Sequence, residues 1–361
     1  MVFYRERCNC LLIYIINVLL IVLYGLVVNK ENEKNRKIVT VLIAIQIFLI
    51  SALRDYTVGT DIIGYLNTYN RFGNMGWNEL NSTRMEFGYA FMNKLLFMIS
   101  TNGRLLLIVV AIIVSISLGK FVYDYSRIPW LSFYLFACLE HFSTSLSALR
   151  MILSIAIILT SIKYVKERKL WKFLLCVIIA FLFHKTAIVI VLLYPLSRFK
   201  INHTYLVFSV FMIIGAYMLG HRITQYLIER FYVEYAAKEL IISGQGKGMF
   251  LLLCLVLLLG LFLRTREMRN DDTMHVLFHM MILSIVFQSI AFSFSVFTRI
   301  TTFFSISMIV FIPNVIYYIT RNDVRLRIMV VSIVCLVTFG FYFTILTGPD
   351  TTGVVPYNFF W

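Results

Sequence analysis

The dominant pattern along this chain is a series of apolar runs that are separated by short polar stretches. Many runs reach about 17–25 residues, the length that a helix needs to cross a bilayer. They do not alternate between apolar and polar residues, which excludes the strand pattern of a membrane β-barrel. The pattern predicts an all-α integral membrane protein, a polytopic bundle of about 10–12 transmembrane helices that forms one membrane-embedded domain over residues 1–361. The expected spans are 11–28, 38–53, 104–122, 130–142, 148–164, 171–193, 205–219, 250–263, 274–293, 301–319 and 328–346.

The longest polar interruption in the first half of the chain follows the second apolar run. It is rich in glycine and carries Arg54, Asp61, Tyr65 and Glu86, more residues than a simple connector needs. We therefore expect a folded external segment at 54–100. Its last part, 85–100, is apolar but charged, and we interpret it as an interfacial or re-entrant helix on the external side.

Basic clusters predict which loops face the cytoplasm. They lie at 30–37, 163–172, 264–269 and 321–327, and the positive-inside rule places all four inside. This leaves 54–100 and a second segment, 221–247, outside, with both ends of the sequence external. A His-Lys pair in hydrocarbon is costly, so His184 and Lys185, in the middle of 171–193, predict a tight external turn between two short helices.

Composition agrees with a membrane protein. Of 361 residues, 60% are hydrophobic and 14% charged, and the mean hydropathy is +0.84. The net charge of +15 is explained by basic loops that set topology, and no nucleic acid is expected as a partner. The six cysteines show no metal-site or disulfide spacing, so neither a structural zinc nor an obligatory disulfide is expected.

Ionisable residues at the external ends of several predicted helices are candidates for function, because such groups are costly near hydrocarbon. Arginines stay charged and bind phosphate through two parallel hydrogen bonds, and a carboxylate or histidine removes a proton from a sugar hydroxyl. The chemistry alone favours a membrane enzyme or carrier for a lipid-linked anionic substrate. The candidates are Arg54, Asp61, Tyr65, Glu86, Arg150, His184, Lys185 and Arg299.

Each candidate also has a structural interpretation. Arg54 is typical of a helix-end arginine that reaches the interface, and Asp61 of a residue that stabilises a helix N-terminus. Glu86 follows Thr83 by three residues, which predicts a capping box. Tyr65 is typical of an interfacial aromatic residue. Arg150 and Arg299 as solvated helix ends, and His184 as a buried histidine, are the remaining alternatives.

Several ordered motifs resemble the EpsG family of Wzy-like bacterial polysaccharide polymerases. A-L-R at 52–54, V-G-T-D-x-x-x-Y at 58–65 and E-F-G-Y at 86–89 open the series. S-A-L-R at 147–150, A-F-L-F-H-K-T-A at 180–187 and T-R-I-T-T-F-F at 298–304 continue it in the order of the family. The resemblance covers most of the chain.

The resemblance implies glycosyl transfer between two undecaprenyl-pyrophosphate-linked repeat units, donor and acceptor, at the external face of the bacterial cytoplasmic membrane. It implies that Arg54, Arg150 and Arg299 stabilise the pyrophosphate and that Lys185 assists. On chemical grounds, Tyr65 and other aromatic residues are expected to stack on sugar rings. Asp61, Glu86 or His184 is then the base. No cofactor or metal is needed if arginines carry the charge, although Asp55 and Asp61 leave a cation open. The bilayer and a chain-length regulator protein are the further partners that it implies.

Two other classes of function stay open. An O-antigen ligase or a GT-C-type polyprenyl-dependent glycosyltransferase also uses external loops, but it would give no polymer of intermediate length. A flippase or exporter of the same lipid-linked oligosaccharide would need polar residues along a pathway to the cytoplasmic face. Such residues are few in the predicted inner halves of the spans.

Overall fold

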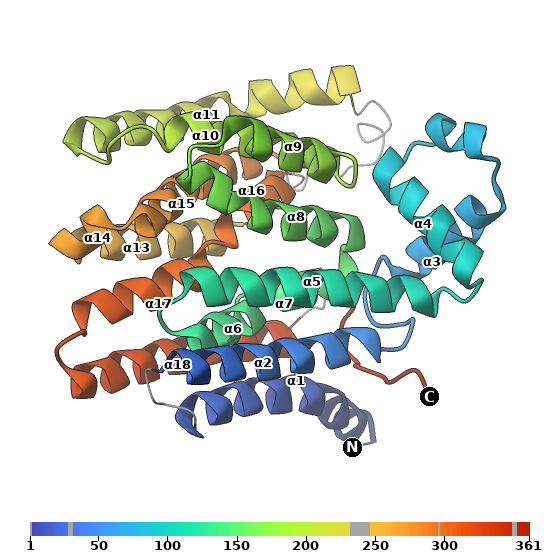
Figure 1. Cartoon of the computed structure of the whole chain (residues 1–361), viewed down its shortest axis with the longest axis horizontal. Coiled ribbons are helices and arrows are strands. Elements are labelled where there is room, and N and C mark those ends of the chain that lie inside the picture. The colour runs from blue at the N-terminus through green and yellow to red at the C-terminus, as the bar shows by residue number, and fades with distance from the viewer. Residues whose placement is uncertain (1, 28–31, 232–245, 295–296, 349–351) are drawn as a thin grey trace. The chain divides into compact units, whose positions relative to one another are not determined.

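The computed structural model describes residues 2–27, 32–231, 246–294, 297–348 and 352–361 (Figure 1). These residues form 17 α-helices and two short 3-10 helices, with no strand among them. Six of these helices are long and apolar enough to cross a membrane. The predicted fold class, an all-α multi-pass membrane protein, is confirmed, and the number of crossings stays a prediction.

The chain divides into two compact units, which are described here one at a time. The first comprises Met1–Ser161, Leu175–Lys185 and Thr320–Trp361, and the second Ile162–Leu174 and Thr186–Ile319. The helices of the first unit are α1 (Val2–Val27), α2 (Glu33–Ala52), α3 (Ile62–Asn74), η1 (Trp77–Ser82), α4 (Phe87–Ile99), α5 (Arg104–Tyr125), α6 (Pro129–Cys138), α7 (His141–Ser147) and α18 (Val324–Thr347), together with most of α8 (Leu149–Lys166) and part of α9 (Leu170–Phe181).

In the first unit, α2 and α5 run antiparallel side by side (Figure 1). At one end, Arg36 donates to the carbonyl oxygens of Tyr123 at 2.7 Å and Ser126 at 3.2 Å. At the other end, Arg104 donates to the carbonyl of Ala52 at 3.3 Å. The segment that connects the two helices therefore begins and ends at the same end of the helix pair. This is the arrangement required if 85–100 does not span the membrane, as predicted.

Helix α4 makes up most of segment 85–100. It has 13 residues, a length of about 20 Å at the rise of an α-helix, whereas the hydrocarbon core measures about 30 Å. It packs against the amphipathic helix α3, whose buried side chains include Tyr65, Tyr69 and Phe72. The two helices form the folded part of the predicted external segment 54–100, and its external position stays a prediction.

Two predicted spans are interrupted. The chain leaves helical geometry after Phe181 and resumes in η2 (Lys185–Leu192), so the break predicted at His184 is present. The expected span 130–142 is not continuous, because α6 ends at Cys138 and α7 starts at His141. Glu140 between them has a φ of 61°, a left-handed conformation that ends a helix.

The second unit is built around α15 (Asp272–Ala291), most of which is buried. His279 in this helix contacts the hydroxyl of Tyr205 at 2.8 Å and the carbonyl of Phe199 at 3.1 Å. Its other helices are α10 (Leu193–Leu196), α11 (His203–Phe231), α13 (Lys247–Phe262), α14 (Arg266–Asn270), α16 (Phe297–Ser305) and α17 (Met308–Ile319). The single-domain prediction for 1–361 and the external placement of 221–247 stay predictions, and 232–245 lie outside the described residues.

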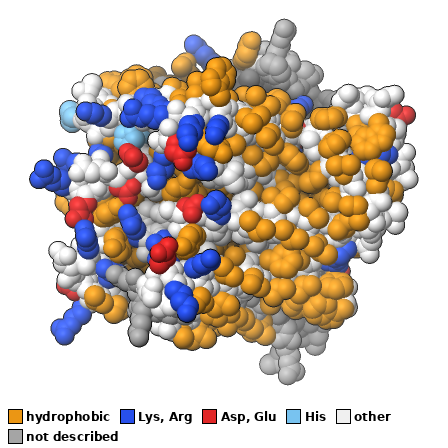
Figure 2. All heavy atoms as spheres, viewed as in Figure 1, with side chains coloured by type: hydrophobic (Ala, Val, Ile, Leu, Met, Phe, Trp, Pro, Cys, Tyr) orange, Lys and Arg blue, Asp and Glu red, His pale blue; other side chains and the backbone are white. Residues whose placement is uncertain are grey.

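Exposed helix faces are apolar, as a lipid environment requires. Hydrophobic side chains cover wide areas of the face seen in Figure 2. In α18, the side chains of Leu336 and Val337 are 73% and 67% exposed. Apolar exposure on this scale marks a membrane or partner surface rather than a soluble one.

Candidate functional site

An ion pair joins two of the predicted candidates in the first unit. Arg150, the second residue of α8, places Nη1 2.6 Å from Oε2 of Glu86, which immediately precedes α4. The Glu86 side chain is 8% exposed and that of Arg150 is 24% exposed. The pair is thus mostly buried, and the Arg150 side chain keeps part of its exposure.

The turn after α9 completes the surroundings of Glu86. The backbone amide of Lys185 donates to Oε1 of Glu86 at 3.2 Å, and Nδ1 of His184 lies 3.7 Å from the same oxygen. The amide of Gly88 donates to the carbonyl of Leu182 at 2.8 Å. A Cβ at Gly88 would lie 2.8 Å from that carbonyl oxygen, so this close backbone approach requires glycine.

Tyrosine rings from α3 and α4 border the pair. The guanidinium carbon of Arg150 lies 6.0 Å from the ring centroid of Tyr65, and the rings of Tyr65 and Tyr89 are 5.7 Å apart. Burial raises the pKa of the Tyr65 hydroxyl, the Arg150 charge opposes this shift, and the Asp61 charge adds to it. The Tyr65 hydroxyl therefore lies within the electrostatic influence of Arg150, a predicted phosphate-binding residue, and of Asp61, a predicted base.

The motif at 58–61 packs against the last residues of α7. The hydroxyls of Thr60 and Ser147 are 2.7 Å apart, and Arg54 donates to the carbonyl of Leu146 at 3.1 Å. Gly59 has a φ of +111°, and a Cβ there would lie 2.8 Å from the same carbonyl oxygen. Both the backbone conformation and the contact therefore need glycine at this position.

Substituting Gly59 by alanine is expected to destabilise the first unit by about 1–3 kcal/mol, the usual cost of one residue held in an unfavourable backbone region. A lowered unfolding temperature of the purified protein in detergent would show it. Gly64→Ala is the matched control, because a Cβ at Gly64 in α3 meets no atom within 4 Å. Equal unfolding temperatures for the two variants would contradict the structural role of Gly59.

The environment of Glu86 determines its charge state. Burial by itself would raise the pKa of this carboxyl. The Arg150 charge and hydrogen bonds, including one from the Lys185 amide, outweigh burial, and the net pKa is lowered. Glu86 is therefore ionised at neutral pH and is a weak proton acceptor while paired with Arg150.

Because the folded-state pKa of Glu86 is lowered, its stabilising effect is fully present above the unfolded value of about 4.3 and is lost as pH falls through the folded value. We expect the unfolding temperature of the wild type to fall on acidification below about pH 4 more steeply than that of Glu86→Gln. Glu79→Gln, which removes an exposed carboxyl of η1, is the control. Parallel curves for wild type and Glu86→Gln would contradict the pairing.

Arg54 occupies a different environment from Arg150. Its side chain is 1% exposed and donates to the carbonyl oxygens of Ser51 and Leu146. Burial lowers the pKa of its guanidinium to about 10, so it remains charged at neutral pH. Pyrophosphate binding by Arg54 would require exchange of these contacts and stays a prediction.

Segment 352–361 covers Arg54 and was not assigned any contact from the sequence. It runs antiparallel to residues 53–60, with an isolated β-bridge between Arg54 and Phe359. Four backbone hydrogen bonds join the two segments: Phe360 N to Leu53 O, Asp55 N to Asn358 O, Gly59 N to Gly353 O and Thr60 N to Thr352 O. The hydroxyl of Tyr357 donates to the carbonyl of Ile50 at 2.7 Å. No apolar periodicity in 352–361 indicates this pairing.

The remaining candidates are placed as follows. Asp61 is exposed, and its side chain makes no capping hydrogen bond to α3. The capping box predicted for Thr83 and Glu86 is wrong, because Glu86 itself precedes α4 and its carboxylate is drawn to Arg150. Arg299 is exposed on α16 of the second unit, so its partnership with Arg150 stays a prediction. Within the described ranges, no cluster of three or more His, Cys, Asp or Glu side chains is arranged to hold a metal.

Comparison with known proteins supports the grouping of these motifs. A model of the EpsG family matches residues 37–359. The chain belongs to the EpsG family. No curated protein and no solved structure matches it.

Membership in the EpsG family implies a role in exopolysaccharide biosynthesis. The family match contains both partners of the ion pair, Glu86 and Arg150, and most of segment 352–361. The resemblance seen in the sequence motifs is therefore confirmed. Together with the six long apolar helices, it makes the chain a multi-pass membrane protein of exopolysaccharide biosynthesis.

Proposed function

We propose that this protein is a polysaccharide polymerase that joins undecaprenyl-pyrophosphate-linked repeat units at the external face of the bacterial cytoplasmic membrane. In the reaction, the bond between the anomeric carbon of the donor glycan and the pyrophosphate oxygen breaks. A bond from the same carbon to a hydroxyl oxygen of the acceptor glycan forms. The acceptor proton passes to a base, and the lipid pyrophosphate leaves with its negative charge.

The observation that carries the proposal is the oriented guanidinium of Arg150, on a side chain that is partly exposed. Glu86 binds Nη1, which fixes the direction of the group, whereas Nε is buried with no hydrogen-bond partner among the described residues. A guanidinium held in this way presents preorganised positive charge where the leaving pyrophosphate develops negative charge. We assign Arg150 to the pyrophosphate, with Lys185 as a further cation.

The base is the second assignment. Glu86 is better suited as a positioning residue, because its carboxylate already accepts hydrogen bonds from Arg150 and from the Lys185 amide. Asp61 is exposed, and its charge contributes to the raised pKa of Tyr65, whose ring borders Arg150. We therefore assign Asp61 as the base on the acceptor hydroxyl, with His184 as the next candidate, and Tyr65 as a surface for a sugar ring.

Reconstitution tests the proposal against its rivals. The purified protein in proteoliposomes is supplied with a synthetic polyprenyl-pyrophosphate-linked repeat unit and no nucleotide sugar. A ladder of products with increasing repeat number is expected. A single transfer to a different acceptor would indicate a ligase or GT-C-type enzyme, and movement of the lipid across the bilayer without new glycosidic bonds would indicate a flippase. Either result, with folded protein, would overturn the proposal.

A further inference from the structure

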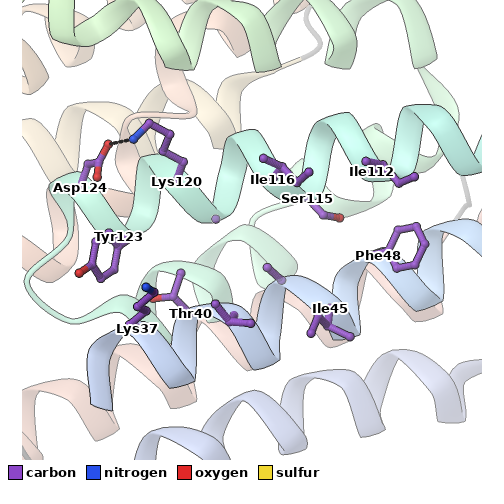
Figure 3. Close-up of a pocket in the computed structure, with 13 residues that line it drawn as sticks. Lys37, Thr40, Ile45, Phe48, Ile112, Ser115, Ile116, Lys120, Tyr123 and Asp124 are labelled. Carbon is purple, nitrogen blue, oxygen red and sulfur yellow. Dashed lines mark ion pairs between the residues drawn. The ribbon is translucent and has the colours of Figure 1, made fainter. Parts of the chain in front are cut away.

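A groove of about 500 Å³ lies between α2 and α5 of the first unit, away from the Glu86–Arg150 pair (Figure 3). Its volume falls within the range of about 300–1,000 Å³ that is typical of small-molecule sites. Apolar side chains form most of its walls. The polymerase proposal makes no use of it.

Small residues create the groove. Thr40 and Ala44 of α2 face Ser115 and Gly119 of α5, and a Cβ at Gly119 would lie 3.3 Å from the Cβ of Ala44. Small residues at four-residue spacing let two membrane helices approach closely. Larger side chains on the outer side then stand as two walls, which include Ile45 (50% exposed) and Ile116 (65% exposed).

The groove has one polar end and one apolar end. Lys37, Lys120, Tyr123 and Asp124 gather at the end formed by the start of α2 and the close of α5 (Figure 3). Lys120 and Asp124 form an exposed ion pair at 3.0 Å, the carboxylate of Glu33 accepts from the Tyr123 hydroxyl at 3.3 Å, and Lys37 is in no ion pair among the described residues. Ile45, Phe48 and Ile112 line the opposite end.

The polar end lies at the basic cluster 30–37, which the positive-inside rule places at the cytoplasmic surface. Arg36 is one residue from Lys37, and Arg127 follows the end of α5. Ser115, in the apolar half of the groove, has a buried hydroxyl with no hydrogen-bond partner among the described residues. Cations at the mouth suit an anionic headgroup.

The length of the groove indicates which kind of lipid chain fits it. From Lys37 to Phe48 is eleven residues of α2, a rise of about 17 Å. One leaflet of a bilayer contributes about half of the 30 Å hydrocarbon core. The groove therefore matches the depth of a single acyl chain in one leaflet and is short for a polyprenyl chain.

We infer that this groove binds a glycerophospholipid of the inner leaflet, with its phosphate between Lys37 and Lys120 and one acyl chain along the apolar walls. The phosphate meets two cations at the mouth, and the chain covers apolar surface that otherwise contacts mobile lipid. The inference does not depend on the polymerase activity.

Native mass spectrometry of the detergent-purified full chain tests the inference. Wild-type protein is expected to retain one phospholipid. Lys37→Ala and Lys120→Ala should each weaken retention about fivefold, the effect of losing one cation near an anionic headgroup. Ile116→Trp, which fills the groove from its wall, should abolish retention, and Asp124→Asn should strengthen retention of phosphatidylglycerol.

Two control variants carry the same changes outside the groove: Lys34→Ala, one turn before Lys37 on α2, and Ile333→Trp on the exposed face of α18. Both should retain lipid as the wild type does. Unfolding temperatures are compared to confirm that all variants are folded. Equal retention in groove and control variants would overturn the inference, as would a polyprenyl phosphate in place of the phospholipid.

Discussion

Replacing Arg150 by alanine is expected to reduce chain elongation by about 100- to 1,000-fold, the usual loss when one preorganised donor to a developing anion is removed. The lipid-linked single repeat unit should accumulate, because the pyrophosphate can no longer leave readily. Polymer length in cells and product ladders from proteoliposomes measure the effect. Arg150→Lys should recover only a small part of it, since an ammonium cannot bind both Glu86 and a phosphate through a planar fork.

Two variants separate the charge of Arg150 from its position. Glu86→Gln leaves the guanidinium in place but weakens its anchor, so a smaller loss of elongation is expected, with a weaker dependence of stability on acid pH. Arg71→Ala removes an exposed arginine from the last turn of α3 and should leave polymer length unchanged. Normal long chains from Arg150→Ala at wild-type protein level would contradict the assignment.

Removing segment 352–361 is expected to reduce elongation by about 100-fold, the loss that a displacement of about 1 Å near the reacting groups produces. The segment makes four backbone hydrogen bonds to residues 53–60 and covers the Arg54 guanidinium. Without it, the Gly59–Asp61 loop loses the segment that it is hydrogen-bonded to, and the proposed base Asp61 loses its fixed position. Product ladders and the unfolding temperature are measured together.

Smaller changes in the same segment make the test specific. Tyr357→Phe removes only the hydrogen bond to the Ile50 carbonyl and should cost about 1 kcal/mol of stability. Deletion of Trp361 alone, a side chain that is 76% exposed, should have no effect on elongation. Full elongation by a folded protein without 352–361 would show that the Gly59–Asp61 loop holds its geometry unaided.

Local features of the sequence predicted the fold class and the positions of most elements. Apolar runs long enough to span a bilayer identify membrane helices because the backbone must satisfy its own hydrogen bonds in lipid. The cost of a His-Lys pair in hydrocarbon likewise predicted the break at His184, which the structure contains. The interruption at Glu140 was missed, since a single left-handed residue leaves no mark on the apolar pattern.

The candidate residues were found from their type and order, but their partners were not. Arg54 and Arg150 look alike in sequence, because each lies close to one terminus of an apolar run and each is preceded by Ala-Leu. In the structure, Arg54 is enclosed by backbone carbonyls and segment 352–361, whereas Arg150 meets Glu86 and remains partly open. The capping-box prediction for Glu86 failed for the same reason, because a distant guanidinium is a stronger partner for its carboxylate than a nearby amide.

The sequence by itself determined that this is a helical membrane protein of the EpsG family and which side chains its motifs supply. Only the tertiary structure decided that Glu86 orients Arg150 and that segment 352–361 closes over Arg54. Periodicity and motif spacing report which face of a helix avoids water. They carry no information on which of several similar faces meet across 64 residues of chain, as Glu86 and Arg150 do, and that choice depends on packing and charge pairing in three dimensions.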